Sequence, residues 1–222
     1  MAELRPQALL DVGCGDGEFL ERYLDYKPAL FCGIEAAPAL RKAAEARGIQ
    51  VKAVDLNGRW PYPDNSFDVV HSSQVIEHLH NTRLFVIEIL RVLKPGGHAL
   101  VTSENLTSFL NLGAMMLGYT PFTLMRVCGW YLGNPLGLHY KEHVEEGVPM
   151  DDPAYAGVTG HIRALSVLQA KELFELAGFE AVESFSMGLM PLPCWLGKRL
   201  EAVMPRRGHF LLVQARKPGK KR

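Results

Sequence analysis

Short apolar runs alternate with amphipathic stretches through the first half of the chain. The runs at residues 8–13, 30–36, 49–56 and 67–73 predict four strands. Residues 17–26 and 38–48 between them predict helices, and residues 75–93 predict one helix or two. A turn with Gly96 and Gly97 leads into a fifth strand that ends at Glu104. This order predicts an α/β fold, in which a parallel sheet has helices on both faces.

The alternation stops after Glu104. From about Asn105 to Gly160 the sequence has scattered Gly and Pro and no clear strand, and it predicts an insertion. Residues 166–180 then predict a helix closed by Gly178, and residues 180–188 and 209–217 predict two strands with a short helix between them. We expect these two strands to form an antiparallel hairpin at the edge of the sheet.

Composition favours one compact domain. The chain has 222 residues, of which 48% are apolar, enough for a substantial buried core. We therefore expect a single domain over residues 1–222, with a core at 6–104 and 160–217 and a cap at 105–159. Lys plus Arg and Asp plus Glu number 24 each, so no net field attracts nucleic acid, and no nucleic-acid partner is expected. Four widely spaced cysteines and the absence of an export signal indicate a cytoplasmic protein.

Three glycines follow the first predicted strand in "LLDVGCGDGEF", residues 9–19. Gly13, Gly15 and Gly17 lie between a strand and a helix, where a ligand can approach backbone amides. A tight turn that needs glycine only for its backbone angles is the alternative. The spacing is G-x-G-x-G rather than the G-x-G-x-x-G of a dinucleotide site, so the NAD pattern does not match.

Acidic residues follow the second and third predicted strands. Glu35 suits the two hydroxyls of a ribose, because a carboxylate accepts two hydrogen bonds at once. Asp55 suits the exocyclic amine of an adenine, and the amide of Leu56 can donate to a ring nitrogen. Two solvated loop acids are the alternative interpretation.

Five segments in order resemble the motifs of class I S-adenosylmethionine-dependent methyltransferases of the small-molecule type 11 kind. They are "LLDVGCGDGEF", "GIEAAP", "VDLN", "WPYPDNSFDVVHSSQVIEHL" and "LKPGGHALVTSEN". The resemblance implies a Rossmann-like sheet of seven strands, mostly parallel, with an antiparallel last strand. It also implies S-adenosylmethionine as cofactor and S-adenosylhomocysteine as product. Family members carry a helix or more ahead of strand one, where this sequence has about eight residues. The insertion is therefore expected to supply the lid.

The resemblance also implies where the cofactor binds. It places the methionine part over the glycine loop with Asp11 near its amino group, the ribose at Glu35 and the adenine at Asp55. The turn after strand four borders the sulfonium, although helix capping is an alternative role for its serine residues. The expected cofactor-binding residues are Asp11, Gly13, Cys14, Gly15, Gly17, Glu35, Ala36, Asp55, Leu56, Ser72, Ser73 and Gln74.

Catalysis of methyl transfer requires little chemistry from the protein, because the sulfonium methyl is already electrophilic. The protein must align the nucleophile and exclude water, and it supplies a base only where the nucleophile must lose a proton. The acceptor should lie beyond the carboxyl ends of strands four and five. His78, His161 and Glu104 are the candidate catalytic residues there. Core packing is the alternative for His78, and a supporting or capping role is the alternative for His161.

Two further segments bear on function. "HYKEH" at residues 139–143 matches the H-x-x-E-H pattern of inverted zinc peptidases but lacks their long helix, so no metal is expected. The apolar stretch at residues 106–125 is interrupted by polar residues, Gly and Pro, so it is not a membrane span. One interpretation is that it forms cap helices packed on the sheet. The alternative is that it forms an apolar acceptor pocket or a surface that contacts lipid.

The sequence therefore predicts methyl transfer from S-adenosylmethionine to a small-molecule acceptor, at oxygen. A binding module that holds S-adenosylmethionine or S-adenosylhomocysteine without turnover is the main alternative, and a zinc peptidase is a distant one.

Overall fold

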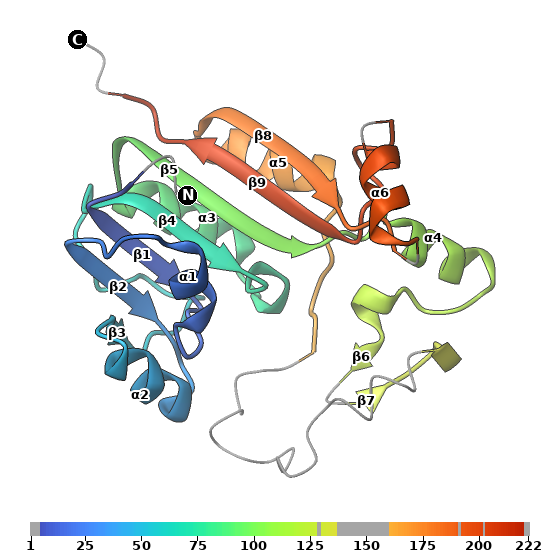
Figure 1. Ribbon diagram of the computed structural model, residues 1–222, viewed down its shortest axis with the longest axis horizontal. Coiled ribbons are helices and arrows are strands. Elements are labelled where there is room, and N and C mark those ends of the chain that lie inside the picture. The colour runs from blue at the N-terminus through green and yellow to red at the C-terminus, as the bar shows by residue number, and fades with distance from the viewer. Residues whose placement is uncertain (1–4, 128–129, 137–159, 191, 202, 220–222) are drawn as a thin grey trace.

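A computed structural model of the chain describes residues 5–127, 130–136, 160–190, 192–201 and 203–219. Its centre is a seven-stranded sheet in the order β3-β2-β1-β4-β5-β9-β8 (Figure 1). The strands are β1 (Ala8–Val12), β2 (Leu30–Ile34), β3 (Gln50–Lys52), β4 (Phe67–Ser73), β5 (Leu93–Glu104), β8 (Glu180–Met187) and β9 (Phe210–Arg216).

Strands β1 to β5 pair in parallel, whereas β9 runs antiparallel to both of its neighbours, β5 and β8. The predicted sheet, mostly parallel with an antiparallel last strand, is confirmed. The last strand is not the edge, however. It lies inside the sheet between β5 and β8, so β8 forms the edge.

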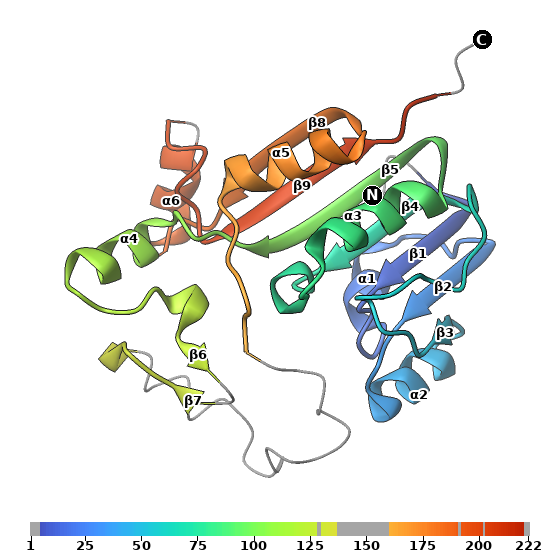
Figure 2. The ribbon, with the colours of Figure 1, turned by 180° about the vertical axis from the view of Figure 1, so that it is seen from behind.

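Helices cover both faces of the sheet, because successive residues of each buried strand point to opposite sides. Leu9 of β1 packs in a cluster with α1 (Glu18–Tyr23) and α2 (Pro38–Ala46). Leu10 packs on the other face with α3 (Thr82–Val92) and α5 (Val167–Ala177). Figure 2 shows α3 and α5 lying over the sheet.

Local signals set the ends of these helices. The side chain of Asn81 caps α3 by accepting from Leu84 N, so residues 75–93 divide into the 3-10 helix η1 (Ile76–His78) and α3. Ser166 and Gln169 form a capping box at the start of α5, and Gly178, with φ at 102°, ends that helix. Two elements are shorter than predicted: α1 ends at Tyr23, and β3 covers only residues 50–52.

The insertion after β5 contains α4 (Phe109–Met116), the 3-10 helix η2 (Phe122–Leu124), β6 (Arg126–Val127) and β7 (Trp130–Tyr131). The expectation of no strand here is wrong, since β6 and β7 pair as a short antiparallel ladder. Residues 137–159, which include the H-x-x-E-H pattern, lie outside the described residues. None of the described helices is both long and apolar enough to cross a bilayer.

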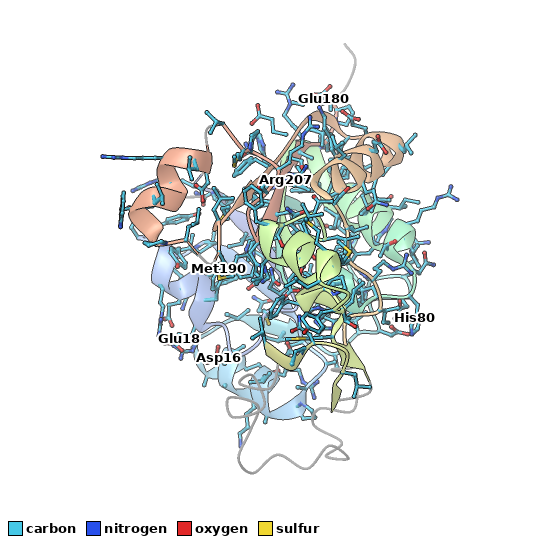
Figure 3. The ribbon with its side chains drawn as sticks, turned by 90° about the vertical axis from the view of Figure 1, so that its right-hand side faces the viewer. Asp16, Glu18, His80, Glu180, Met190 and Arg207 are labelled. Carbon is cyan, nitrogen blue, oxygen red and sulfur yellow. The ribbon has the colours of Figure 1, made fainter. Side chains whose placement is uncertain are left out.

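The start of the insertion is fixed to the loop that precedes β9. The Asn105 side chain donates to Arg206 O and Gly208 O at 3.0 and 2.7 Å, and Phe109 N donates to Arg207 O at 3.1 Å. This loop also follows α6 (Cys194–Glu201), so α4 and α6 lie at the same end of the molecule (Figure 1). Figure 3 looks onto that end, with α4 in front, Asp16 and Glu18 on one side of it and His80 on the other.

Candidate functional site

A crevice of about 670 Å³ lies where β1, β2 and β4 end. In an open α/β sheet the carboxyl ends of the strands are the usual place for a ligand. Four of the motifs recognised in the sequence, from separate βα units, reach this crevice. The predicted site residues that line it are Gly13, Glu35, Ala36, Asp55, Leu56, Ser73, Gln74 and His78.

The glycine loop meets the crevice at Gly13. Its φ is +72°, and a Cβ atom there would lie 2.3 Å from Cγ2 of Val75, so the chain itself requires glycine at this position. The loop amides are bonded within the chain: Gly13 N and Cys14 N donate to Ile34 O at 2.8 and 3.0 Å, and Gly17 N donates to Cys14 O at 2.9 Å. The expectation that a ligand meets bare amides is therefore wrong for these three groups. Gly13 instead presents a backbone without a side chain.

The Glu35 carboxylate is held at the crevice by two backbone amides. Its Oε2 accepts from Gly15 N at 3.0 Å and its Oε1 from Ala37 N at 2.8 Å. Each carboxylate oxygen has a second lone pair, so both oxygens can also accept from the hydroxyls of a bound sugar. Gly15 itself is not among the residues that line the crevice.

Asp55 lies on the opposite side of Glu35 from the glycine loop, in the segment after β3. Its Oδ1 accepts from the backbone N and the side-chain Nδ2 of Asn57, at 2.9 and 3.0 Å. Asn57 Oδ1 in turn accepts from Asn81 N at 3.0 Å. These bonds fix the exposed carboxylate of Asp55 relative to the start of α3, which orients it before any ligand binds.

The turn after β4 has a strained backbone. Gln74 has φ at 55°, in the left-handed region that residues with a side chain rarely adopt. The turn is held because Gln74 N donates to Thr102 O at 3.1 Å and Ser73 Oγ lies 2.8 Å from Thr102 Oγ1. Strain of this kind often marks a functional site.

Five of the expected cofactor residues, Gly15 among them, do not line the crevice. Ser72 is fully buried and its hydroxyl donates to Val12 O at 2.9 Å, so its side chain does not border the cofactor. The Asp11 carboxylate is 3% exposed and lies 2.7 Å from His71 Nδ1, on the face that α1 covers. The Cys14 side chain is buried in the cluster of that face, where burial raises the pKa of its thiol to about 12. Gly17 packs against Ile49.

The three candidate catalytic residues lie together. His78 ends η1, Glu104 ends β5, and His161 lies on the segment that returns from the insertion to α5. The rings of His78 and His161 are 4.9 Å apart, and His161 Nδ1 is 3.3 Å from Glu104 Oε2. Because His78 also lines the crevice, this group borders the expected cofactor site.

The return segment is held in place by backbone hydrogen bonds. Ile162 N donates to Glu77 O at 2.9 Å, and Leu106 N donates to Leu165 O at 3.0 Å. The contact with Glu77 brings His161 next to η1, and the contact with Leu165 places the segment beside the end of β5.

The sequence did not indicate that Glu77 and Thr123 belong to this group. Glu77 is 1% exposed, and its Oε2 accepts from Ser103 Oγ at 2.9 Å. The Thr123 carbonyl lies 2.7 Å from His161 Nδ1. An acidic residue within the apolar run "VIEHL" is the one local sign that Glu77 has a special role.

Burial and charge act on these groups in opposite directions. Burial raises the pKa of the Glu77 carboxyl above its ordinary value. Burial lowers the pKa of His161, but the hydrogen bond and charge of Glu104 outweigh it, so the pKa of His161 is raised. Carboxylates and imidazoles in one polar group can accept a proton or bind an acceptor hydroxyl.

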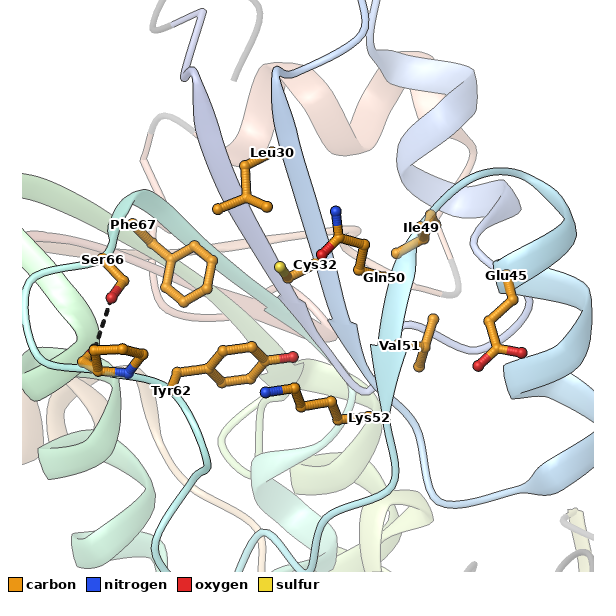
Figure 4. A pocket seen from close by; sticks show the side chains of 11 residues that line it. Leu30, Cys32, Glu45, Ile49, Gln50, Val51, Lys52, Tyr62, Ser66 and Phe67 are labelled. Carbon is orange, nitrogen blue, oxygen red and sulfur yellow. Dashed lines mark hydrogen bonds between the residues drawn. The ribbon is translucent and has the colours of Figure 1, made fainter.

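A second hollow, of about 520 Å³, lies along β3 (Figure 4). Its polar groups include Cys32 and Tyr62, whose hydroxyl donates to Gly33 O at 3.0 Å. Burial raises the pKa of both groups, so neither the thiolate nor the phenolate forms readily. This hollow contains none of the predicted site residues.

Comparisons with known proteins agree with this geometry. Residues 10–101 match a family model described as a methyltransferase domain. The chain is 34% identical over 110 residues to a probable tocopherol O-methyltransferase of Oryza sativa subsp. japonica, covering 46% of this chain and 30% of that protein. It is 34% identical over 114 residues to ajmaline N-methyltransferase of Rauvolfia serpentina, covering 46% of this chain and 38% of that protein.

A similar fold occurs in an S-adenosylmethionine-dependent methyltransferase from Mesorhizobium loti. The TM-score is 0.56 at 22% identity, over 94% of this chain and 90% of that one. The chain spans well under half the length of each of the two plant relatives. The matched domain contains the glycine loop, Glu35, Asp55 and the turn after β4, which are the parts that form the crevice. Residues 10–101, which contain all the residues that line the crevice, therefore match the methyltransferase-domain family.

Proposed function

We propose that the chain transfers the methyl group of S-adenosylmethionine to an oxygen of a small-molecule acceptor. The observation that carries this proposal is the position of the crevice, where the expected cofactor residues lie directly beside the group of His78, His161 and Glu104. One end of the crevice can hold the cofactor while the polar group faces the acceptor.

The cofactor part of the proposal rests on Glu35, Asp55 and Gly13. Glu35 binds the ribose hydroxyls through its two amide-bound oxygens, and Asp55 with the amide of Leu56 binds the adenine edge. The methionine part extends toward Gly13 and Gln74, which brings the sulfonium to the end of β4. A reducing cytoplasm as its place of action agrees with the free thiols of Cys14 and Cys32.

The acceptor part rests on the polar group. An acceptor hydroxyl gives up its proton to that group while its oxygen forms a bond to the methyl carbon. The bond between carbon and sulfur breaks, and its electron pair returns to sulfur to give S-adenosylhomocysteine. An amine with a free lone pair needs no such proton acceptor, so half-buried imidazoles and a carboxylate in one polar group favour oxygen as the methylated atom. The exposed apolar side chains of α4, including Met115 and Met116, favour an acceptor with an apolar part.

Calorimetry and label transfer test the proposal together. We expect one S-adenosylhomocysteine to bind per chain, and labelled methyl groups to pass from S-adenosylmethionine to a component of a metabolite extract. In the His161→Ala variant, binding should persist and transfer should fall at least about 100-fold. Binding without transfer in any extract would favour the non-catalytic module. No binding of S-adenosylhomocysteine at millimolar concentration, with binding of NAD, would contradict the family assignment of the crevice.

A further inference from the structure

Glu77, His78 and His161 form a compact set of metal-ligating side chains. One carboxylate oxygen and one nitrogen from each imidazole lie within 4.8 Å of one another, and no other such group occurs among the described residues. The sequence alone does not reveal the set, because His161 is brought to η1 only by the bonds of Ile162 N and Arg163 N to Glu77 O, at 2.9 and 3.3 Å.

The Glu77 carboxylate has an unsatisfied oxygen. Its Oε2 accepts from Ser103 Oγ, whereas its Oε1 is buried and has no hydrogen-bond partner within the described ranges. The whole residue is only 1% exposed. A buried carboxylate oxygen without a partner is costly, and a bound cation is one of the ways in which proteins compensate for it.

The His161 ring is already oriented as a metal ligand. Its Nδ1 lies 2.7 Å from the Thr123 carbonyl, so Nδ1 carries the hydrogen and Nε2 keeps its lone pair. Histidines that bind metals commonly donate their other ring N–H to a backbone carbonyl or a carboxylate, which fixes the ring. Here Glu104 Oε2, also buried, lies 3.3 Å from the same Nδ1 and supports that orientation.

We propose that Glu77, His78 and His161 bind one divalent transition-metal ion of the zinc type. Two imidazoles and one carboxylate suit zinc and its first-row neighbours, whereas magnesium and calcium prefer oxygen ligands alone. Three protein ligands leave a coordination position open, as in catalytic rather than structural zinc sites. Since His78 lines the crevice, that position faces the acceptor side.

The role of the ion rests on the proposed function, although the binding of the ion does not. A hydroxyl bound at the open position becomes more acidic, because the cation stabilises the oxygen anion. The hydroxyl proton leaves to solvent, the oxygen forms a bond to the methyl carbon of the cofactor, and the carbon–sulfur bond breaks with its electron pair returning to sulfur. The acceptor class is accordingly a compound whose hydroxyl can reach the metal, such as a phenol or an alcohol.

Binding of Co²⁺ to the full chain, freed of metal by a chelator, tests the site without any need for activity. We expect one Co²⁺ per chain, visible as d–d absorption bands, and displacement by Zn²⁺. The variants Glu77→Gln and His161→Ala should weaken Co²⁺ binding at least about tenfold. His161→Cys should keep the ion and add a thiolate charge-transfer band, which a merely structural role of His161 would not produce.

Two control variants locate the ion. His80→Ala removes an exposed imidazole two residues from His78 and should leave Co²⁺ binding unchanged. The double variant His139→Ala with His143→Ala removes the H-x-x-E-H pattern and should also leave it unchanged. Loss of binding only in the double variant, or no stoichiometric binding at all, would overturn the site. Binding of Co²⁺ by a chain that fails to bind S-adenosylhomocysteine would overturn the proposed function but not the metal site.

Discussion

At Gly13 two physical constraints act on one residue. Its φ of +72° strains any side chain, and a Cβ atom would also meet Val75 at 2.3 Å. Gly15 has φ at +55° with nothing within 4 Å of an added Cβ, so it carries the first constraint alone. Comparing substitutions at the two glycines therefore separates the effect of backbone strain from that of steric contact within the glycine loop.

We predict that Gly15→Ala destabilises the chain by about 1 kcal/mol through backbone strain, and that Gly13→Ala costs more. Val75→Ala should recover part of the loss in Gly13→Ala and none in Gly15→Ala. Urea denaturation of the single and double variants measures these differences. Equal losses in the two glycine variants would mean that Val75 moves aside freely.

Replacement of Glu35 should weaken cofactor binding most directly. We expect Glu35→Ala to weaken S-adenosylhomocysteine binding by about 1.5–3 kcal/mol, the range for hydrogen bonds to a charged group. Calorimetry measures this change, and Glu45→Ala, an exposed glutamate on α2, is the matched control. If the Glu35→Ala variant melts like the parent and binds S-adenosylhomocysteine with unchanged affinity, Glu35 does not contact the cofactor and serves only to hold the loop.

At the scale of elements, an ion pair within α3, between Glu88 and Arg91, holds the loop before β4 through hydrogen bonds to the loop backbone. Glu88 Oε2 accepts from Trp60 N at 2.7 Å and from Arg91 at 2.6 Å. Arg91 also donates to Tyr62 O and Trp60 O, at 2.7 and 3.0 Å. The carboxylate therefore satisfies both a buried amide and a guanidinium that holds the loop.

This network predicts a pH-dependent stability. Burial works to raise the pKa of Glu88, but its bonds from Arg91 and Trp60 N outweigh burial and lower it below the ordinary 4.5. The ionised carboxylate thus stabilises the fold above pH 4.5, and this contribution is lost as the pH falls through the lowered pKa. Glu88→Gln should cost about 1–3 kcal/mol at neutral pH, and the difference should shrink in acid. Urea titrations across this range, with the exposed Glu172→Gln as control, measure it.

The predictable elements are those whose signal is local. The residues of β4 match the predicted run 67–73, and the capping residues of α5 are visible in the sequence. The predicted strand at 49–56 shrinks to β3 because this strand lies at an edge and pairs only with β2. Most of the crevice residues follow from strand ends, whereas the meeting of Glu77 with His161 depends on a backbone contact between distant segments. No periodic pattern encodes such a contact.

At the scale of the whole molecule, we propose that the insertion is a cap on a single domain and not a second domain. Among the hydrophobic residues of its described part, Ala114 and Met125 are buried, but Met115 and Met116 are 43% and 87% exposed. Polar contacts hold it instead, among them Asn111 Nδ2 to Asn105 O at 3.0 Å.

Hydrogen exchange should reveal the cap as a separate cooperative unit. We expect fast exchange over residues 109–127 in the free protein and slower exchange with S-adenosylhomocysteine bound, while β1, β4 and β5 stay protected in both states. If exchange over the same residues is slow without ligand and does not change when ligand binds, the insertion is a rigid part of the scaffold and not a mobile cap. Phe109 and Met115 would then be ordinary packing residues.

The contact between Asn105 and the loop before β9 also bears on how the protein is made. The ribosome completes β1, β2 and β3, which lead into Gly13, Glu35 and Asp55, before β5 and β9, so this part of the crevice can assemble while the later strands are still being synthesised. The carbonyls of Arg206 and Gly208 that hold Asn105 emerge about a hundred residues after it. A nascent chain can therefore complete the strands around the crevice before the start of the insertion is fastened to the loop that precedes β9.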